Sequence, residues 1–341
     1  MAEFVEALLG ELKLHQRHLE LRPKTIHFGG GTPTLLSAAH LEALFSGLRQ
    51  VADLSDLHEL CLEANPKTIG SAKARLLREA GVTRVSLGVQ SWDETVLRTL
   101  GRDHSPGEAE EAWQELREAG IPSLNVDLMF SIPGLGVQKW EHSLEKTLSL
   151  RPDHISAYNL TYEEDTAFLE QLRRGELDSD ADRDADHFSA AMDRLEAEGF
   201  EHYEISNYAR PGHRSAHNSA YWHGADYLGI GPSAVSTVQR ERWKNLPDTA
   251  AYVGAIAEGR IPAIESEQLD ESKWLMERVA LELRTIEGTP LERIRPEVRP
   301  HLEQLMAEDW VKLDEDSKRI QLTRQGLPMA DTIAEQLLPD E

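Results

Sequence analysis

Glycines and polar residues follow several short apolar runs in the first half of the sequence. Three glycines occupy positions 29–31, directly after one such run, and Thr32 comes next. Glu63, Gln90 and Asp127 lie at or near the ends of three later runs. Glycine leaves no Cβ in the way of a ligand that approaches the backbone, and carboxylate and amide oxygens accept hydrogen bonds from hydroxyl and ammonium groups. The pattern therefore indicates a site for an amino-acid head group or a nucleoside.

The glycine-rich segment has two other interpretations. One is a phosphate-binding loop, but the segment lacks the Gly-Lys-Ser/Thr ending of a P-loop and the spacing of the dinucleotide-binding fingerprint. The other is a turn with a purely conformational role. Recognition of an amino-acid head group or a nucleoside by backbone groups is at least as compatible with this sequence as a phosphate-binding loop. The loop therefore stays in the candidate site.

A second candidate is His217, which stands in the sequence HNSAYW together with Tyr221 and Trp222. His213 and His217 form an i, i+4 pair that would bind zinc if both lay on one helix. The Pro-Gly pair at 211–212 argues against a helix that continues through His213, so we expect no metal ligands here. A histidine with only a structural role is a further alternative for His217.

The candidate residues need a scaffold that brings them together, and the first 160 residues supply one. Apolar runs typical of strands alternate with stretches of helical periodicity: strands are expected at 24–28, 58–63, 84–89, 125–130 and 154–160, and helices at 41–51, 72–80, 108–119 and 139–150. This alternation predicts an α/β fold with a parallel sheet of βαβ units, more typical of a barrel than of a flat open sheet. In such folds the C-terminal ends of the strands carry the site.

Side chains alternate along a strand, so Glu59, Cys61 and Glu63 share one face of the second expected strand. If that face is the barrel interior, Leu60 and Leu62 pack outwards against helices. Cys61 is then a small buried core residue and not a ligand. The chain has no other cysteine, which excludes an internal disulfide and a multi-cysteine metal site.

The last part of the chain has a different pattern. Helices are expected at 272–283 and 302–308, strands at 310–313 and 319–322 around an acidic turn, and a final helix at 323–338. This order predicts a small winged-helix-like domain at 259–341, after a first domain at 1–258. Because the turn between the two strands is acidic, docking to a protein partner or a structural role is favoured over DNA binding.

Composition excludes some classes of protein. The 341 residues include 36 Lys and Arg against 60 Asp and Glu, a net charge of −24. Nucleic-acid binding needs clustered positive charge, so we expect no nucleic-acid partner. No stretch approaches the roughly 20 apolar residues of a membrane span, so we expect no direct membrane insertion. Together with the single cysteine, these features predict a cytoplasmic protein.

Longer motifs carry a family resemblance. The segments FGGGTPTLLS, CLEANPKT, VSLGVQSWDETVLRTLGRDH, NVDLMFSIPG and HISAYNLT resemble the radical S-adenosylmethionine (SAM) proteins of the oxygen-independent coproporphyrinogen III oxidase family. HYEISNYARPG, the HNxxYW pattern at 217–222 and DYLGIGPSA resemble its heme-chaperone branch. The motifs follow one another in the family's order from the beginning of the chain to its end.

The resemblance implies roles for individual residues. His217 would contact heme, with Tyr221 and Trp222 supplying flat apolar surface. An arginine pairs with a carboxylate in a fork geometry, and for Arg102 the alternative is a solvated surface residue. The positions that match SAM-binding positions of the family, the first three of them lining the methionine group, are Gly30, Gly31, Thr32, Glu63, Gln90, Arg102 and Asp127.

One departure from the family is severe. Its members carry a Cys-x3-Cys-x2-Cys loop after the first barrel strand, and those thiolates hold a [4Fe–4S] cluster, whereas this sequence has no such loop. The resemblance therefore implies a partial, open β/α barrel of radical SAM type that lacks the first strand. As written, the chain should not perform radical chemistry, and we assign no catalytic residues. We expect a truncated N-terminus; loss of the cluster is the alternative.

The resemblance favours a heme chaperone that binds heme and transfers it to acceptor proteins, and that binds SAM and a [4Fe–4S] cluster when it is N-terminally complete. Two alternatives remain. One is an oxygen-independent coproporphyrinogen III oxidase, which decarboxylates propionates by SAM radical chemistry. The other is a cluster-less module that binds heme or SAM.

Overall fold

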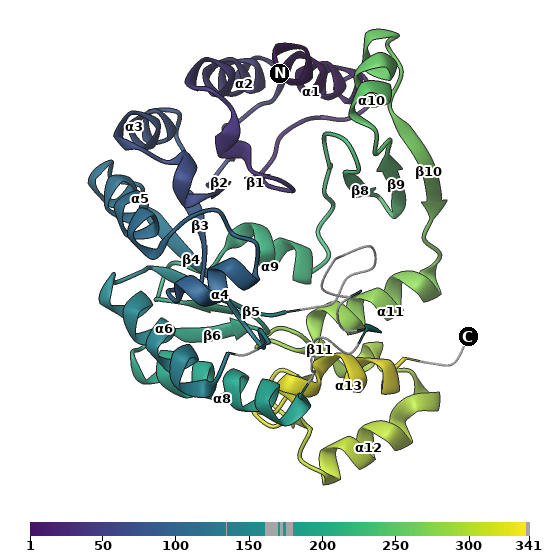
Figure 1. Cartoon of the computed structure of the whole chain (residues 1–341). Helices are drawn as coiled ribbons and strands as arrows, with labels where there is room; N and C mark the ends of the chain where they lie inside the picture. Colours follow the sequence, from purple (N-terminus) through teal and green to yellow (C-terminus); the bar gives the residue numbers. More distant parts are fainter. Residues whose placement is uncertain (134, 161–169, 171–172, 175–179, 339–341) are drawn as a thin grey trace. The chain divides into compact units, whose positions relative to one another are not determined.

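The computed structural model describes residues 1–133, 135–160, 170, 173–174 and 180–338 (Figure 1). Gly134 and Thr161, the last residues of two motifs quoted above, lie outside this range. The α-helices are α1 Ala2–His15, α2 Ala38–Val51, α3 Ser71–Glu79, α4 Glu94–Thr99, α5 Pro106–Glu118, α6 Val137–Ser149, α8 Ala181–Ala197, α9 Ala216–Trp222, α10 Thr249–Ala257, α11 Glu271–Glu282, α12 Arg299–Ala307 and α13 Ala330–Gln336.

The strands form three sheets. They are β1 Thr25–Phe28, β2 Glu59–Ala64, β3 Arg84–Gln90, β4 Ser123–Phe130, β5 His154–Asn159, β6 Glu201–Glu204, β7 Asn207–Ala209, β8 Val235–Val238, β9 Glu241–Asn245, β10 Ala263–Gln268, β11 Thr289–Pro290, β12 Val311–Asp314 and β13 Arg319–Leu322. Short 3-10 helices are η1 Pro33–Leu35, η2 Pro66–Thr68, η3 Leu291–Arg293, η4 Pro296–Val298 and η5 Leu327–Met329.

The largest sheet has seven strands in the order β1-β2-β3-β4-β5-β7-β6. Neighbours from β2 to β5 run parallel, and β7 and β6 add antiparallel pairs at one side. Parallel neighbours need a crossover connection, and α3, α5 and α6 supply it between successive strands. The sheet ends in two edges, β1 and β6, so it is open as expected.

The two faces of strands β2–β5 differ in chemistry. One face is apolar and fully covered, with no exposed surface on Leu62, Val85, Val126 and Ile155. Figure 1 shows α3, α5, α6 and α8 along the outer side of these strands. The other face carries polar side chains that the register sets side by side: Glu63 beside Ser86, Ser86 beside Asn125, and Asp127 beside Ser156. The sheet therefore presents a polar inner surface on an apolar outer layer.

The predicted alternation along β2 is present. Leu60 and Leu62 are buried, at 5% and 0% exposure, and Cys61 is buried with a free thiol. Each outward leucine thus packs in the core, as the period of two along a strand requires.

The described residues divide into two compact units. The first unit comprises residues 1–27, 35–60 and 215–341, and the second comprises 28–34 and 61–214. The second unit holds the glycine-rich loop and the ends of the parallel strands, and the first holds His217. The boundary expected between residues 258 and 259 stays a prediction.

The C-terminal elements follow the predicted order with two differences. The β12–β13 hairpin is joined by a two-residue strand, β11, which pairs with β13. The last helix begins at Ala330 and not at 323, because Thr323 Oγ1 accepts the backbone N–H of Gly326 in a turn at 3.1 Å. Pro328 then falls in η5 and supplies no N–H. None of the helices in the described part of the chain is both long and apolar enough to span a membrane.

Candidate functional site

The glycine-rich loop is held in place at its C-terminal end by Thr34. Thr34 is fully buried, and its Oγ1 accepts hydrogen bonds from the backbone N–H of Asn65 at 3.4 Å and from the hydroxyl of Thr68 at 2.5 Å. The Lys73 ammonium donates to the Thr34 carbonyl. Gly30 has a φ of 83°, which glycine adopts without strain. The loop is therefore held against the segment that follows β2.

The loop is open where the ligand is expected. A Cβ placed on Gly30 or Gly31 would meet no atom within 4 Å. The described neighbours therefore do not require a glycine at 31, whose φ is not positive. An empty space beside backbone groups is what a methionine head group that binds to the backbone needs.

Asn65 connects the glycine loop to Arg102. Its backbone N–H reaches Thr34, and its side chain donates to Asp103 at 3.4 Å. Next along the chain, His104 is buried and its Nε2 bonds to the Val89 carbonyl at the end of β3 at 3.0 Å. These contacts fix the segment that carries Arg102 close to the ends of β2 and β3, while the Arg102 side chain itself is exposed.

Gln90 ends β3 in an irregular conformation. Its φ is 65°, and the register of β3 against β4 shifts between Leu87 and Gln90. The side chain folds back over Gly88: a Cβ on Gly88 would lie 3.1 Å from Gln90 Nε2 and 3.6 Å from the Ala64 carbonyl of β2. The glycine thus gives the Gln90 amide room beside the end of the neighbouring strand.

Asp127 is the centre of a hydrogen-bond network on the inner face of the sheet. The Ser86 hydroxyl lies 2.9 Å from both carboxylate oxygens, and the Asn125 amide donates to Oδ1 at 2.6 Å. Burial raises the pKa of Asp127 to about 6, Glu63 adds to the rise through its charge, and the hydrogen bonds from Ser86 and Ser156 oppose it. The carboxylate is therefore held in a fixed direction and titrates near neutral pH.

The network continues to a buried histidine. The Asn125 amide nitrogen donates to Ser156 at 2.9 Å, so its oxygen accepts from His154 Nδ1 at 2.7 Å. Nε2 of His154 then accepts from the Tyr203 hydroxyl at 2.8 Å. Burial holds the pKa of His154 well below its usual range. A neutral imidazole with one donor and one acceptor fits this chain of partners.

His217 lies at the beginning of α9 in the first unit, and Glu59 holds that end of the helix. The Glu59 carboxylate is buried and accepts the backbone N–H groups of Ala216 at 3.1 Å and His217 at 2.9 Å, and the Ser215 hydroxyl at 3.3 Å. The first N–H groups of a helix have no partner within the helix, and a negative charge there is favourable. Glu59 therefore fixes the backbone that carries His217.

The ring of His217 is oriented by two neighbours. Its Nδ1 and Thr25 Oγ1 are 3.1 Å apart, and the ring stacks on His27 with the centroids 4.8 Å apart. Burial, with a further contribution from His27, lowers the pKa of His217 to about 4. The imidazole is therefore neutral at physiological pH. Nε2 has no hydrogen-bond partner among the described residues, which leaves its lone pair available.

Aromatic surface flanks His217 on one side. The ring of Tyr221, one turn along α9, makes an edge contact with His217 at 4.9 Å between centroids, and Tyr227 lies 4.5 Å beyond it. Tyr221 is 39% exposed, so its ring is accessible. Trp222, the other aromatic residue of the motif, is partly buried at the end of α9.

The zinc alternative has no support from the helix. The helix α9 begins at Ala216, so His213 precedes it and the two histidines do not share a helical face. Nδ1 of His213 lies 3.2 Å from the Ser123 hydroxyl. Among the residues that the structure describes, no group of three His, Cys, Asp or Glu could hold a metal ion.

Comparison with known proteins decides the family. A sequence profile described as the radical SAM superfamily matches residues 6–147. The heme chaperone HemW of Lactococcus lactis is 31% identical, over 99% of this chain and 90% of the relative. The heme chaperone HemW of Mycobacterium tuberculosis is 36% identical, over 97% of this chain and 85% of the relative. The chain belongs to the HemW family.

A solved structure agrees on the fold. Coproporphyrinogen III oxidase (HemN) from Escherichia coli, a radical SAM enzyme by its title, matches 98% of this chain and 82% of its own with a TM-score of 0.83. At 23% sequence identity the likeness concerns the fold alone. The predicted α/β fold, an open half-barrel of radical SAM type, is confirmed.

In this HemW-family chain the candidate residues form two groups. The second unit brings together the end of the glycine loop, Glu63, Gln90 and Asp127, with Arg102 exposed on an adjoining segment. The first unit holds His217 with Thr25, His27, Glu59 and Tyr221. The roles assigned to them in SAM and heme binding stay predictions.

The two cofactors of the radical SAM superfamily differ in how they fit these residues. The second unit offers SAM an open glycine loop, two acidic side chains and the Gln90 amide. A [4Fe–4S] cluster needs Cys thiolates, whereas this HemW-family chain contains only Cys61, which is buried in β2. The residues present therefore do not fit the cluster, and we derive no chemistry through it.

Several supporting residues carried only a weak signal in the sequence. Thr34, Asn65, Ser86 and Asn125 belong to residue types that are common at turns and strand ends. The motif CLEANPKT contains Asn65, and the period of two along β3 and β4 puts Ser86 and Asn125 on the face of the candidate carboxylates. The alternation along the strand predicted that Glu59 and Glu63 share a face. The contact between Glu59 and the helix that begins 157 positions later could be found only in the structure.

Proposed function

We propose that this protein binds heme through His217 and passes it to acceptor proteins in the cytoplasm. The observation that carries the proposal is a neutral imidazole, held by Thr25 and Glu59, whose Nε2 is available beside the exposed ring of Tyr221. A neutral imidazole is a common axial ligand of heme iron. The names of the HemW relatives support the same function.

The geometry gives each neighbour of His217 a part in binding. Thr25 at Nδ1 sets the ring orientation, and a hydrogen bond at one ring nitrogen directs the lone pair of the other. Stacking on His27 restricts rotation of the ring. Tyr221 supplies a flat apolar surface on which a porphyrin can pack. Because the pKa of His217 is about 4, the ring stays mostly neutral down to about pH 5, and binding should not weaken as pH falls from 7.5 to about 5.

A heme titration tests the proposal. The wild-type chain, His217→Ala and His40→Ala are titrated with ferric heme and followed by the Soret absorbance. His40 lies at the exposed beginning of α2 and serves as the control. We expect His217→Ala to bind at least tenfold more weakly and to shift the Soret band, with His40→Ala unchanged. An unchanged affinity and an unchanged Soret band in His217→Ala would contradict the role of His217 in heme binding.

We propose further that the second unit binds SAM, with Glu63 and Asp127 as hydrogen-bond acceptors and the glycine loop at the methionine group. The open space beside Gly30 and Gly31, and the electrostatic effect of Glu63 on Asp127 across the inner face of the sheet, support this role. Calorimetric titration with SAM of the wild type, Glu63→Gln and the exposed control Glu111→Gln tests it. We expect Glu63→Gln to lose at least tenfold in affinity. Equal affinities in all three proteins would contradict the assignment.

The alternatives separate by activity. A coproporphyrinogen III oxidase needs SAM radical chemistry, and the thiolates that this would require are absent from the chain. We therefore propose a binding function for the chain as it stands, with no coproporphyrinogen consumed in an anaerobic assay. With a net charge of −24, we also propose no nucleic-acid partner. We propose no direct membrane insertion, because no stretch of the sequence approaches the roughly 20 apolar residues of a membrane span. Consumption of coproporphyrinogen would restore the oxidase alternative.

A further inference from the structure

The segment that joins α4 to α5 carries an exposed arginine, and both of its ends are fixed. The Arg102 N–H donates to the Leu97 carbonyl of α4 at 2.9 Å. At the other end, the Ser105 hydroxyl accepts the Glu108 N–H at 3.3 Å, and the Glu108 carboxylate accepts the Ser105 N–H at 2.7 Å. This reciprocal pair is a capping box, which fixes the beginning of α5.

His104 anchors the middle of the segment to β3. Its side chain is 5% exposed, and its Nε2 lies 3.0 Å from the Val89 carbonyl. Because a carbonyl only accepts, Nε2 carries the proton and Nδ1 is the acceptor of the ring. Nδ1 is buried without a hydrogen-bond partner among the described residues, which is unfavourable. An apolar residue would avoid that cost but would also lose the bond to Val89.

The anchor lies where candidate residues of the second unit gather. Val89 directly precedes Gln90, whose φ of 65° ends β3. A second anchor comes from Asn65, which follows β2 and donates to Asp103 at 3.4 Å. Together the two anchors hold the backbone of Arg102 at the ends of β2 and β3.

The guanidinium of Arg102 has no anionic partner in the described part of the chain. The side chain is exposed, and no carboxylate among the described residues forms an ion pair with it. Burial lowers the pKa of His104, the hydrogen bond to Val89 opposes this, and the charge of Arg102 lowers it further. The arginine therefore lies near the ring that anchors its backbone, and its fork of N–H groups is available to a carboxylate.

We propose that His104 is a positioning residue, which holds Arg102 where it meets the carboxylate of SAM. The inference rests on the proposed SAM binding and assigns recognition of the ligand's carboxylate to the α4–α5 segment. An arginine loses side-chain freedom when it binds a ligand, and a mobile backbone would add to that loss. The bond to Val89 removes the second part. His104 thus acts through the backbone of Arg102.

The experiment compares SAM with decarboxylated SAM, which lacks the carboxylate and keeps the sulfonium, the amine and the nucleoside. In calorimetric titrations we expect the wild type to bind SAM at least tenfold more tightly. Arg102→Gln should lose this preference. His104→Asn, whose amide reaches only to the place of Nδ1, should lose most of it. His104→Gln, whose amide nitrogen takes the place of Nε2, should retain it. Every variant should bind decarboxylated SAM as the wild type does.

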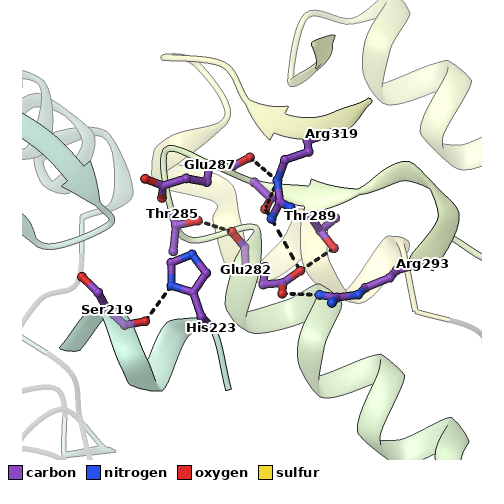
Figure 2. Close-up of polar contacts among 9 residues, drawn as sticks. Ser219, His223, Glu282, Thr285, Glu287, Thr289, Arg293 and Arg319 are labelled. Carbon is purple, nitrogen blue, oxygen red and sulfur yellow. Dashed lines mark hydrogen bonds and ion pairs between the residues drawn. The ribbon is translucent and has the colours of Figure 1, made fainter. Parts of the chain in front are cut away.

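Two further proteins distinguish positioning from general destabilisation. Thr289→Val removes a buried hydroxyl of the first unit, which donates to Glu282 at 3.1 Å (Figure 2). This variant should lower the stability of the chain and leave the preference for SAM unchanged. The double variant Arg102→Gln/His104→Asn should behave as Arg102→Gln does, because residues that act as one unit are not additive.

The outcomes separate the inference from the proposed function. A wild type that binds neither ligand would overturn the SAM proposal and the inference with it. Equal binding of both ligands would overturn the inference and leave SAM binding in place. A His104→Asn variant that keeps the full preference, or that weakens both ligands to the same extent, would overturn the role of His104 alone.

Thermal unfolding of each variant without ligand shows that it folds. If His104→Asn does not fold, nitrogen NMR of the His104 ring in the wild type decides the question. Its resonances should shift with SAM and stay with decarboxylated SAM, because a bound carboxylate neutralises the Arg102 charge that acts on the ring. Equal shifts with both ligands would contradict the inference.

Discussion

At the scale of single residues, Asp127 shows how a binding site lowers stability. The carboxylate is buried among Ser86, Asn125 and Ser156, and its pKa rises to about 6 because ionisation is opposed by burial and by Glu63. The folded chain at neutral pH therefore carries a charge that it would hold more easily if unfolded. Sites that recognise polar ligands commonly retain such groups at a cost in stability.

Replacement of Asp127 by Asn tests this cost. In the unfolded chain the carboxyl titrates near 3.8 and in the folded chain near 6. Between these values the folded state binds more protons, so the stability of the wild type falls as pH rises from 4 to 6 and stays low above 6. At about 1.4 kcal/mol per pKa unit, Asp127→Asn should gain up to about 3 kcal/mol at pH 7.5 and almost nothing near pH 4. Urea unfolding at both pH values measures the difference.

A second measurement keeps this prediction specific. Asp127→Asn should bind SAM at least tenfold more weakly while it unfolds at higher urea concentration. The exposed variant Glu111→Gln, on α5, provides the control for both readouts. A stability difference that is independent of pH would show that the titration of Asp127 is not its cause.

Sequence reasoning could reach some residues of the site and not others. Glu63 and Gln90 stand at the ends of β2 and β3, where the direction of a parallel sheet already places them. Asp127 lies in the middle of β4, and only the period of two along the strand places it on the inner face. Arg102 was reached only through the family motif, and its side chain is exposed. Serine, threonine and asparagine side chains make the contacts that hold the site. Their hydrogen-bond partners are determined by tertiary packing, so the sequence does not show them.

At the scale of elements, α9 owes its position to a strand. The helix has only seven residues, fewer than an isolated helix needs in water. Glu59 on β2 caps its first turn, and Ser215 adds a second cap by accepting the Asn218 N–H at 3.2 Å. The orientation of His217 thus depends on a carboxylate that acts through the backbone of α9, and Glu59 is a positioning residue.

Glu59→Gln should loosen this helix. The substitution removes the negative charge from the helix N-terminus and turns an amide N–H₂ towards backbone N–H donors, at a cost of about 1–2 kcal/mol. We expect a lower melting temperature and a several-fold loss of heme affinity, with the Soret band of His217 ligation retained. Amide hydrogen exchange at 216–219 should increase more than elsewhere. A uniform increase in exchange along the chain would instead indicate global destabilisation.

The elements themselves were predictable to different degrees. Strands and helices of the βα repeat have strong periodicity, and the structure places β2–β5 within two residues of the expected ranges. The irregular end of β3 at Gln90, the two-residue strand β11 and the late start of α13 were not predictable. Each is fixed by a bulge, a short pairing or a turn at a proline, and leaves no periodic signal.

At the scale of the whole chain, a buried carboxylate in α1 connects segments of the first unit that lie far apart in the sequence. Glu11 has no exposed surface and accepts hydrogen bonds from the Gly231 N–H at 2.9 Å, the Asn245 amide at 2.6 Å and the Tyr252 hydroxyl at 2.5 Å. Gly231 belongs to the motif DYLGIGPSA and has a φ of 112°. The family motif therefore has a structural part here, which sequence analysis did not separate from function.

Loss of that carboxylate should be costly. Glu11→Gln leaves three donors facing an amide that offers one acceptor, and a buried donor without an acceptor costs about 1–3 kcal/mol. We expect a loss of about 3 kcal/mol or more in unfolding free energy, measured by urea denaturation, while Glu6→Gln, on an exposed position of the same helix, changes little. Tyr252→Phe removes one donor together with its hydrogen bond, so its loss should be smaller. If Glu11→Gln and Tyr252→Phe cost the same, the stability of the first unit comes from apolar packing of α1 on α2 and α10 and not from this network.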